Sequence, residues 1–401
     1  MAEKSFKFVD KAQKADSEQL RPSLTYWQDA WRRLKKNKLA MAGLVGVIGI
    51  ILFGIVGPFF TPYSYEEQVL DHANLPPKFE TMQIKDDEFL FLSRDYKMVL
   101  VDGDGNIIKR LDDVDKDVIN KIYTYDYNGN DEVDEGDVVL DFSYRTDPTK
   151  ANLGIDFTIE FEGTVYDEIT DSFGNNTYKW GTDNLGRDIQ TRVMFGARIS
   201  LTVALAATLV NLLIGVTYGS IAGYVGGSTD NIMMRIVDII NSIPLLLYVI
   251  LLMVIFNEQG LGTIIIALAS VYWVGMARLV RGQVLGLKEQ EYVLAAKTIG
   301  VPGRKIIARH LIPNAMGPII VSMTMMIPSA VFTESFLSFI GLGVSAPQAS
   351  WGTLANDALG GLTSYPYMLF YPAAAIAVTM LAFNFLGDGL RDALDPRLRK
   401  G

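Results

Sequence analysis

The chain has 401 residues, of which 49% are hydrophobic, and a formal net charge of −9. Its mean hydropathy of +0.21 is high for a soluble protein of this length and modest for one that lies wholly in a membrane, so a mixed protein is expected. The absence of cysteine excludes disulfides, thiolate metal sites and cysteine nucleophiles. Residues 61–195 carry 30 acidic and 13 basic residues, whereas the rest of the chain carries 15 and 23. The two parts therefore face two different environments.

The first hydrophobic segment follows a basic leader. Residues 1–38 are polar and contain ten Lys and Arg, and residues 39–60 contain no charge. At about 1.5 Å per residue, the second stretch is long enough to cross a bilayer core of about 30 Å. It exceeds the usual hydrophobic region of a secretory signal, and no A-x-A-like cleavage site follows it. We interpret 1–38 as a cytoplasmic segment and 39–60 as the first transmembrane helix.

Residues 61–190 are predicted to form an inserted, mainly-β extracytoplasmic domain. Alternating runs rich in aromatic and β-branched residues favour strands at 96–101, 107–111, 138–144 and 155–161. Residues 102–106, between the first two runs, are typical of a hairpin turn. About 130 residues of this composition can bury a core of their own, so a folded domain is expected rather than a disordered loop.

One acidic turn in this insert resembles a calcium loop of the EF-hand or dockerin type. In its twelve residues, positions 1, 3, 5, 7 and 12 are Asp126, Asn128, Asn130, Glu132 (through its carbonyl) and Asp137. Calcium prefers such a shell of several oxygens. Position 6, where a glycine usually makes the sharp turn, is Asp131, and no flanking helices are evident. The alternative is an acidic, solvated turn.

Five further hydrophobic stretches have the length and the low charge of membrane spans. They lie at 199–223, 232–256, 261–280, 314–340 and 367–387. If six spans alternate, 22 of the 23 basic residues outside 61–195 fall on one side of the membrane. By the positive-inside rule, both ends of the chain are then cytoplasmic and the acidic insert is outside. We predict an all-α membrane protein of six transmembrane helices with the β insert, a five-helix core at 191–387 and a cytoplasmic tail at 388–401.

The longest basic segment between two spans, residues 289–313, is predicted to form two short cytoplasmic helices. Good helix formers fill 289–299, Gly300 supplies a left-handed stop, and Pro302 prevents continuation. A second helix is expected to follow and to end at Pro313.

The same segment resembles the coupling loop, or EAA loop, of ABC-importer permeases. Ala295, Ala296, Gly300 and Pro313 fall at the matching spacing, whereas Leu294 stands where the loop usually has Glu. The resemblance implies that this turn docks on a cytoplasmic ATPase. We expect both alanines on the exposed turn, where small side chains let a partner surface approach closely.

Further motifs resemble the C-type permease subunit of oligopeptide, dipeptide and nickel ABC importers. They lie at 181–188, at 334–343 with 350–352, and at 384–392 with 395–397. With the coupling loop, the resemblance covers about 31–60 and 180–398, which is nearly everything except the insert. It implies the permease fold of a type I ABC importer.

Glu334 is an acidic residue near the end of the fifth span. A carboxylate in a span costs about 2.5–3.5 kcal/mol on insertion scales at the bilayer centre, and less near an interface. One interpretation places Glu334 in the translocation pathway or its gate, facing a charged substrate. The alternative is an interfacial Glu that is bonded to neighbouring backbone and fixes the outer loop.

The resemblance implies a permease subunit of an ATP-driven importer of oligopeptides or dipeptides. Its implied partners are a homologous second permease, two cytoplasmic ABC ATPases and an extracytoplasmic peptide-binding protein. No Gly-x4-Gly-Lys-[Ser/Thr] loop occurs, so ATP and magnesium are expected in the ATPases, and no catalytic residue or cofactor is expected here beyond calcium in the insert. The basic residues border spans beside membrane lipid, which disfavours nucleic acid as a partner.

Two alternatives remain open at this stage. The same machine would serve another cargo, such as nickel complexes or oligosaccharides, because the binding protein largely selects the cargo. A more distant alternative is a membrane-anchored calcium-binding or adhesion protein, in which the acidic insert is the active part. Six spans argue against it, since one anchor would suffice.

Overall fold

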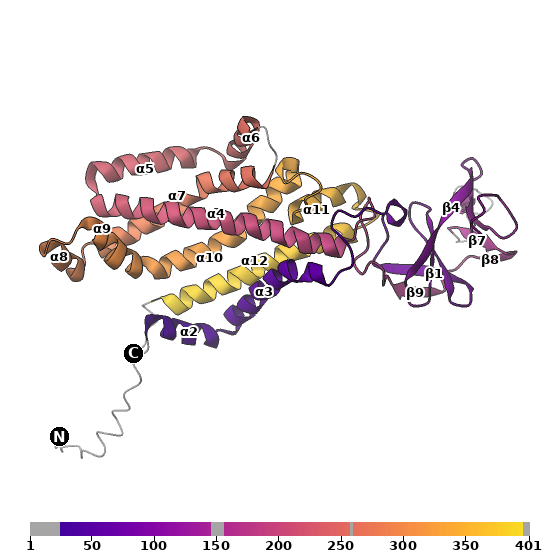
Figure 1. Cartoon of the computed structure of the whole chain (residues 1–401), viewed down its shortest axis with the longest axis horizontal. Coiled ribbons are helices and arrows are strands. Elements are labelled where there is room, and N and C mark those ends of the chain that lie inside the picture. The colour runs from indigo at the N-terminus through magenta and orange to yellow at the C-terminus, as the bar shows by residue number, and fades with distance from the viewer. Residues whose placement is uncertain (1–24, 146–155, 257–259, 396–401) are drawn as a thin grey trace, which may run out of the picture.

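The computed structural model describes residues 25–145, 156–256 and 260–395. Figure 1 shows an elongated molecule in which a helical bundle carries a β domain at one end. The turn between α8 (Glu291–Thr298) and α9 (Gly303–Ile306) lies at the other end of the bundle. Helix α2 (Tyr26–Lys36) also lies toward this second end (Figure 1). The bundle therefore separates the β domain from the turn between α8 and α9.

Within the described residues, five continuous helical segments are long and apolar enough to cross a membrane. They are α3 (Lys38–Ile55), α4 (Ile189–Val225), α7 (Leu261–Leu287), the segment Gly303–Leu342 that contains α10 (Ile312–Leu337), and α12 (Tyr367–Leu394). They correspond to the predicted first, second, fourth, fifth and sixth spans. Helix α4 starts earlier than predicted, because the side chain of Asp188 caps its N-terminus by accepting from the N–H of Thr191 at 2.7 Å.

The third predicted span is not a continuous helix, which corrects the expectation for 232–256. Helices α5 (Gly227–Ser242) and α6 (Leu245–Phe256) are bent by 85° at the break between them. Pro244 explains the break, because the residue before a proline is pushed out of the helical region, and Ile243 is extended with φ −86° and ψ 122°. In Figure 1, α5 returns alongside α4 toward the β-domain end, where α6 turns across. If the bent pair is counted as one span, the described residues contain six candidate spans in all.

Glycines on one face of α4 allow it to pack closely against α7. Gly215, Gly219 and Gly223 recur every fourth residue. A Cβ at Gly215 would lie 2.6 Å from the Cβ of Met276, and one at Gly223 would lie 2.9 Å from the carbonyl oxygen of Arg281. In a membrane, where burial from water does not drive helices together, small residues at this spacing let two backbones approach. Helices α4 and α7 therefore form one close-packed unit.

The insert folds into a mainly-β domain, as predicted. In the described residues, nine strands form one antiparallel sheet in the order β8-β7-β6-β5-β4-β3-β2-β1-β9. The strands are β1 (Lys78–Lys85), β2 (Glu88–Leu92), β3 (Met98–Val101), β4 (Ile107–Asp117), β5 (Ile122–Asp126), β6 (Val138–Asp141), β7 (Thr158–Phe161), β8 (Thr164–Tyr166) and β9 (Asp171–Gly174). The predicted hairpin turn joins β3 and β4, and the Asp102 carboxylate accepts the N–H of Asn106 at 2.7 Å.

Strand residues face two separate cores, because successive side chains point to opposite sides of a sheet. Leu90 and Leu100 pack with residues of β5, β6 and β7. Val99, the neighbour of Leu100 in β3, points to the opposite side and packs instead with Leu75 and Tyr178. The sheet therefore bends, so that β5, β6 and β7 cover one face of β2 and β3.

Residues that flank β1, β2 and β3 attach the insert to the helical bundle by hydrogen bonds. The N–H of Leu75 donates to the hydroxyl of Thr182, and the N–H of Thr182 donates back to the Leu75 carbonyl, both at 2.9 Å. The hydroxyl of Tyr367, in the first turn of α12, donates to the Thr182 carbonyl at 3.2 Å. Arg94 donates to the carbonyl of Thr363 at 3.1 Å. The insert is therefore a domain anchored to one end of the bundle, the end opposite the turn between α8 and α9.

Gly219→Val tests the close packing of α4 on α7. A Cβ at Gly219 would overlap the carbonyl oxygen of Ala277, so the helices must separate, and such overpacking typically costs about 1–3 kcal/mol. We expect a lower thermal midpoint for the detergent-solubilised chain. Gly275→Val is the matched control, because a Cβ there meets no atom within 4 Å. Equal midpoints for the two variants would contradict this packing.

Candidate functional site

The predicted stop and restart of the helix are observed at the bundle end away from the sheet. Helix α8 ends at Thr298, and Gly300 has φ +80°, in the left-handed region that favours glycine. The N–H of Gly300 bonds to the carbonyl of Lys297, and the N–H of Val301 bonds to that of Ala296, both at 3.0 Å. These bonds close a rigid turn before α9 begins.

The predicted end of the second helix at Pro313 is wrong. The helix that begins at Gly303 continues through α10 into the π-helical turn Ser338–Leu342, in which Gly341, with φ +85°, leaves the helical conformation. A π-helical turn over Ile307–Leu311 precedes α10, and Pro313 falls in the first turn of α10, where a proline is tolerated. The side chain of Asn314 donates to the carbonyl of His310 at 2.6 Å and so satisfies a backbone group of that turn. The α8–α9 turn is therefore continuous with a membrane-spanning helix.

The two alanines of the turn face opposite sides. Ala295 is exposed, whereas Ala296 is 7% exposed and packs with Val293 in a core formed with residues of α7 and α10. The expectation that both alanines lie on the exposed turn is therefore wrong for Ala296, because its side of α8 faces the chain's own bundle. Leu294 and Ile299 are exposed, at 44% and 80%.

We define the coupling surface as Leu294, Ala295 and Ile299 with the exposed basic residues Arg304 and Lys305. Gly300 and Pro313 are also exposed. Apolar side chains that are exposed together and bordered by polar residues are typical of a protein contact site. The geometry therefore fits a docking surface at the end of the bundle opposite the sheet.

Glu334 is fully buried at the other end of α10 and is ringed by serines. Its carboxylate accepts from the hydroxyls of Ser200 of α4 and Ser338, each at 2.8 Å, and from Ser335 at 3.4 Å. Ser350, which precedes α11 (Trp351–Asp357), also bonds to it. The carboxylate thus joins α4, the end of α10 and the start of α11. This geometry matches the interpretation of Glu334 as a residue that fixes the outer loop, although its partners are side chains rather than backbone.

Motifs that are separate in the sequence meet in space at the β-domain end of the bundle. Trp351, which is 1% exposed, donates from its indole to the carbonyl of Val193 at 3.0 Å. The Trp351 ring packs directly on Gly196 of α4. A Cβ at Gly196 would lie only 3.0 Å from the ring, so a larger residue there would push the ring away. Residues 181–196, the end of α10 and the start of α11 are therefore packed together at the outer end of the bundle.

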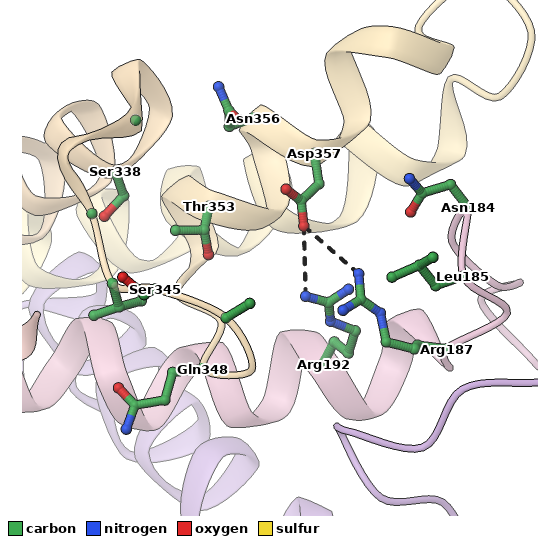
Figure 2. Close-up of a pocket in the computed structure, with 14 residues that line it drawn as sticks. Asn184, Leu185, Arg187, Arg192, Ser338, Ser345, Gln348, Thr353, Asn356 and Asp357 are labelled. Atoms are coloured by element: carbon green, nitrogen blue, oxygen red, sulfur yellow. Dashed lines mark ion pairs between the residues drawn. The ribbon is translucent and has the colours of Figure 1, made fainter. Parts of the chain in front are cut away.

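Beside Glu334, two buried arginines and two aspartates form a polar cluster. Asp183 accepts from the Nε of Arg187 at 2.7 Å and from Arg192. Asp357 of α11 faces both guanidinium groups at longer range, 3.9 Å from Arg187 and 3.6 Å from Arg192 (Figure 2). Burial raises the pKa of the Asp357 carboxyl, although the two arginines lower it. The arginines line a cavity of about 350 Å³.

The acidic turn of the insert does not form a calcium shell in this geometry. The carboxylate of Asp126 accepts the N–H groups of Gly129 at 2.5 Å and Asp131 at 2.8 Å, and Asp137 accepts the N–H of Asp134 at 3.0 Å. Asn128 and Asn130 both donate their amide N–H to Asp134. Glu132 is exposed, and in the described part of the chain no group of three His, Cys, Asp or Glu side chains is placed to hold a metal. The oxygens that a cation would need are engaged by N–H donors, so the fit is poor and calcium binding stays a prediction.

Sequence reasoning missed several members of these clusters. Ser200, Arg192 and Asp357 lie outside the quoted motifs, and nothing in their local sequence marks them. Their partners are distant along the chain, since Ser200 and Glu334 are 134 residues apart. The one available signal was charge, because Arg192 is a basic residue inside a predicted outer segment.

Comparisons with known proteins identify the family. Residues 215–400 match the model of the binding-protein-dependent transport system inner membrane component, and residues 25–77 match the N-terminal TM domain of oligopeptide transport permease C. The dipeptide transport system permease protein DppC of Bacillus subtilis is 43% identical over 98% of this chain and 92% of its own length. The oligopeptide transport system permease protein OppC of the same organism is 41% identical, over 97% and 96%. Both alignments therefore include the insert.

Among solved structures, an inward-facing MetNI methionine ABC transporter chain is 19% identical, with a TM-score of 0.43 over 51% of this chain and 96% of its own. The family assignment rests on the curated relatives and the family models. Members of this family are transport subunits of the inner membrane, and the family name implies binding-protein and ATPase partners. The chain belongs to the binding-protein-dependent transport system inner membrane components, as a multi-pass permease of the OppC/DppC type rather than an enzyme.

Proposed function

We propose that this permease forms half of the translocation pathway of an ATP-driven importer of dipeptides or oligopeptides. The observation that carries the proposal is one continuous helical segment, Gly303–Leu342, with the coupling surface before its start and Glu334 near its end. The printed names of relatives aligned over nearly the whole chain support peptides as the cargo. They do not favour nickel complexes or oligosaccharides, and a calcium-binding or adhesion role has no support in a transport family.

In the proposed mechanism, the coupling surface seats in a groove of one ATPase, and Ala295 permits close approach. A homologous second permease and a second ATPase complete the machine, and ATP and magnesium act in the ATPases. When the ATPases close, the α8–α9 turn moves as a rigid body and carries α10 with it. The spans then rock between inward-open and outward-open states. This chain contributes motion and a pathway, and no covalent chemistry.

Glu334 would transmit this motion at the outer end. Its serine partners belong to α4, α10 and the start of α11, so a shift of α10 must move the outer loop or break those bonds. A buried carboxylate that lost its partners would be costly in a membrane, which favours movement of the whole group together. We therefore assign Glu334 to the gate as a holding residue, and not to contact with cargo.

The orientation is part of the proposal. The positive-inside rule places the coupling surface and both ends of the chain in the cytoplasm. Arg198, the one exception, donates to the carbonyls of Gly54 and Ile55 at 2.6 and 2.8 Å, so its position is explained by capping the end of α3. Membrane lipid would then surround the exposed apolar residues of the spans.

The insert would serve as an external docking surface for the peptide-binding protein. It is anchored to the outer end of the bundle and is strongly acidic, which offers a basic partner surface electrostatic complementarity. A lid that limits access to the pathway is the alternative role.

Substitution of the two alanines separates docking from folding. Ala295→Trp places a bulky side chain on the coupling surface, so we expect ATPase binding to weaken about tenfold or more while the thermal midpoint is kept. Ala296→Trp, its matched control, should lower the midpoint because Ala296 is packed inside the chain. The measurements are ATPase co-purification and thermal unfolding. Normal ATPase binding and transport by a stable Ala295→Trp variant would refute docking at this surface.

A partial deletion tests the insert. Replacing residues 113–166 by a short flexible linker removes β5–β8 and the second half of β4, and keeps β1, β2, β3 and β9, which are near the anchor at Leu75. We expect the affinity of the binding protein for the assembled transporter to fall about tenfold. The affinity is measured in nanodiscs, with ATPase co-purification as the control for intact assembly. Unchanged affinity with faster uptake would support the lid instead.

A further inference from the structure

The cavity beside the polar cluster has the size of a small-ligand site. Its volume of about 350 Å³ lies within the range of about 300–1,000 Å³ that is usual for such sites. Its walls come from the start of α4, the loop after α10 and α11. Figure 2 shows Arg187, just before α4, and Arg192, on α4, pointing toward Asp357 on α11. The cavity therefore lies at the outer end of the bundle, next to the group that includes Glu334.

Both arginine side chains are buried, but their guanidinium nitrogens do not all have close hydrogen-bond partners. Their side chains are only 8% and 3% exposed. Asp183 satisfies one nitrogen of each, but the Nε of Arg192 has no hydrogen-bond partner among the described residues. Asp357, at 3.6 and 3.9 Å, is beyond the usual N–H···O distance of about 2.7–3.2 Å. The Nε of Arg192 is itself closed off from solvent, so an acceptor in the cavity would take the place of the loosely held Asp357 beside the other guanidinium nitrogens.

The charges at the cavity fit a carboxylate in the place of Asp357. Arg187 and Arg192 are both paired with Asp183, which does not line the cavity, and Asp357 is the one acidic residue among the lining residues. Because the two arginines and two aspartates balance in charge, a carboxylate that displaced Asp357 would keep that balance. Arginine matches the planar geometry of a carboxylate and can bind it through two parallel hydrogen bonds. Asp357 is itself a carboxylate, and its side chain is 45% exposed, so it can move away without leaving a buried charge. Leu185 and Val344 add apolar wall for an aliphatic group.

We propose that this cavity binds the terminal carboxylate of a peptide cargo, which replaces Asp357 between Arg187 and Arg192. The inference rests on the proposed function, because peptides are the cargo it assigns. A chain end fits better than a protein surface, since the cavity is small and walled by three segments. Displacement of Asp357 would release α11, whose first residues contact α4 and whose preceding serine bonds Glu334. Cargo at the outer mouth would thereby loosen the gate.

The test compares a short peptide with its C-terminal amide in proteoliposomes that contain the complete transporter and its binding protein. The measured quantity is the ratio of kcat/KM for uptake of the free acid to that of the amide. Because every variant uses the same binding protein, any preference of the binding protein cancels between variants. In Asp357→Asn, the internal competitor loses its charge, so we expect the ratio to rise about tenfold. Arg187→Gln should lower it.

Asp71→Asn is the matched control, since Asp71 is also an outer aspartate paired with an arginine, at 2.8 Å from Arg110, but does not line the cavity. Its ratio should equal that of the wild type. An unchanged ratio in Asp357→Asn, with normal peptide uptake, would overturn the carboxylate site and leave the proposed function intact. Absence of uptake of either peptide by the wild type would instead refute the proposed function. A change in binding-protein affinity that is the same for acid and amide would assign the arginines to the binding protein and contradict this proposal.

Discussion

The buried carboxylate of Glu334 is the interaction on which the outer end of this permease depends. A charged group in a membrane-spanning segment is costly unless it is paired, and here serine hydroxyls from separate segments supply the hydrogen bonds. Those bonds hold α4, α10 and α11 in one arrangement. The packing of Trp351 against α4 and the neighbouring Arg–Asp cluster extend that arrangement toward the outside.

The same helix reaches the opposite end of the molecule. Because the π-helical turn before Pro313 lets the helix continue, the coupling surface and Glu334 belong to one mechanical element. Gly300 fixes the turn at one end, and the serines fix the other. The β domain is attached at the outer end through Thr182, next to the segment that starts α4. The segment that contains α10 therefore contacts elements at both ends of the bundle.

Features that depend on local sequence were predictable. The spans follow from long uncharged stretches, the stop at Gly300 from its conformational freedom, and the β3–β4 hairpin from the residues of its turn. Features that depend on distant segments were not. The burial of Ala296 depends on packing against α7 and α10, which is invisible in the spacing of the coupling loop. The bend at Pro244 had a local signal, the proline itself, but apolar composition outweighed it in the prediction.

The candidate site shows the same division. Glu334 stood out as an acidic residue in a span, and its two interpretations could not be separated without knowing that Ser200 and Ser350 face it. In the acidic turn at 126–137, the spacing of oxygen-bearing residues predicted a calcium loop. In the folded chain, the Asp126 oxygens accept backbone N–H groups, which the spacing alone does not reveal.

The central claim is that Glu334 transmits motion from the ATPases to the outer loop. Because the chain has no cysteine, a single cysteine at Gln348, which lines the cavity beside α11, can report on that loop without background from the rest of this chain. The decisive measurement is the rate at which a thiol reagent modifies this cysteine in the assembled transporter. The rate is compared with and without trapped ATP, both in the chain that keeps Glu334 and in the Glu334→Ala variant. We predict a nucleotide-dependent change in rate with Glu334, and its loss in Glu334→Ala while ATPase binding is retained. An equal nucleotide-dependent change in both would contradict the account.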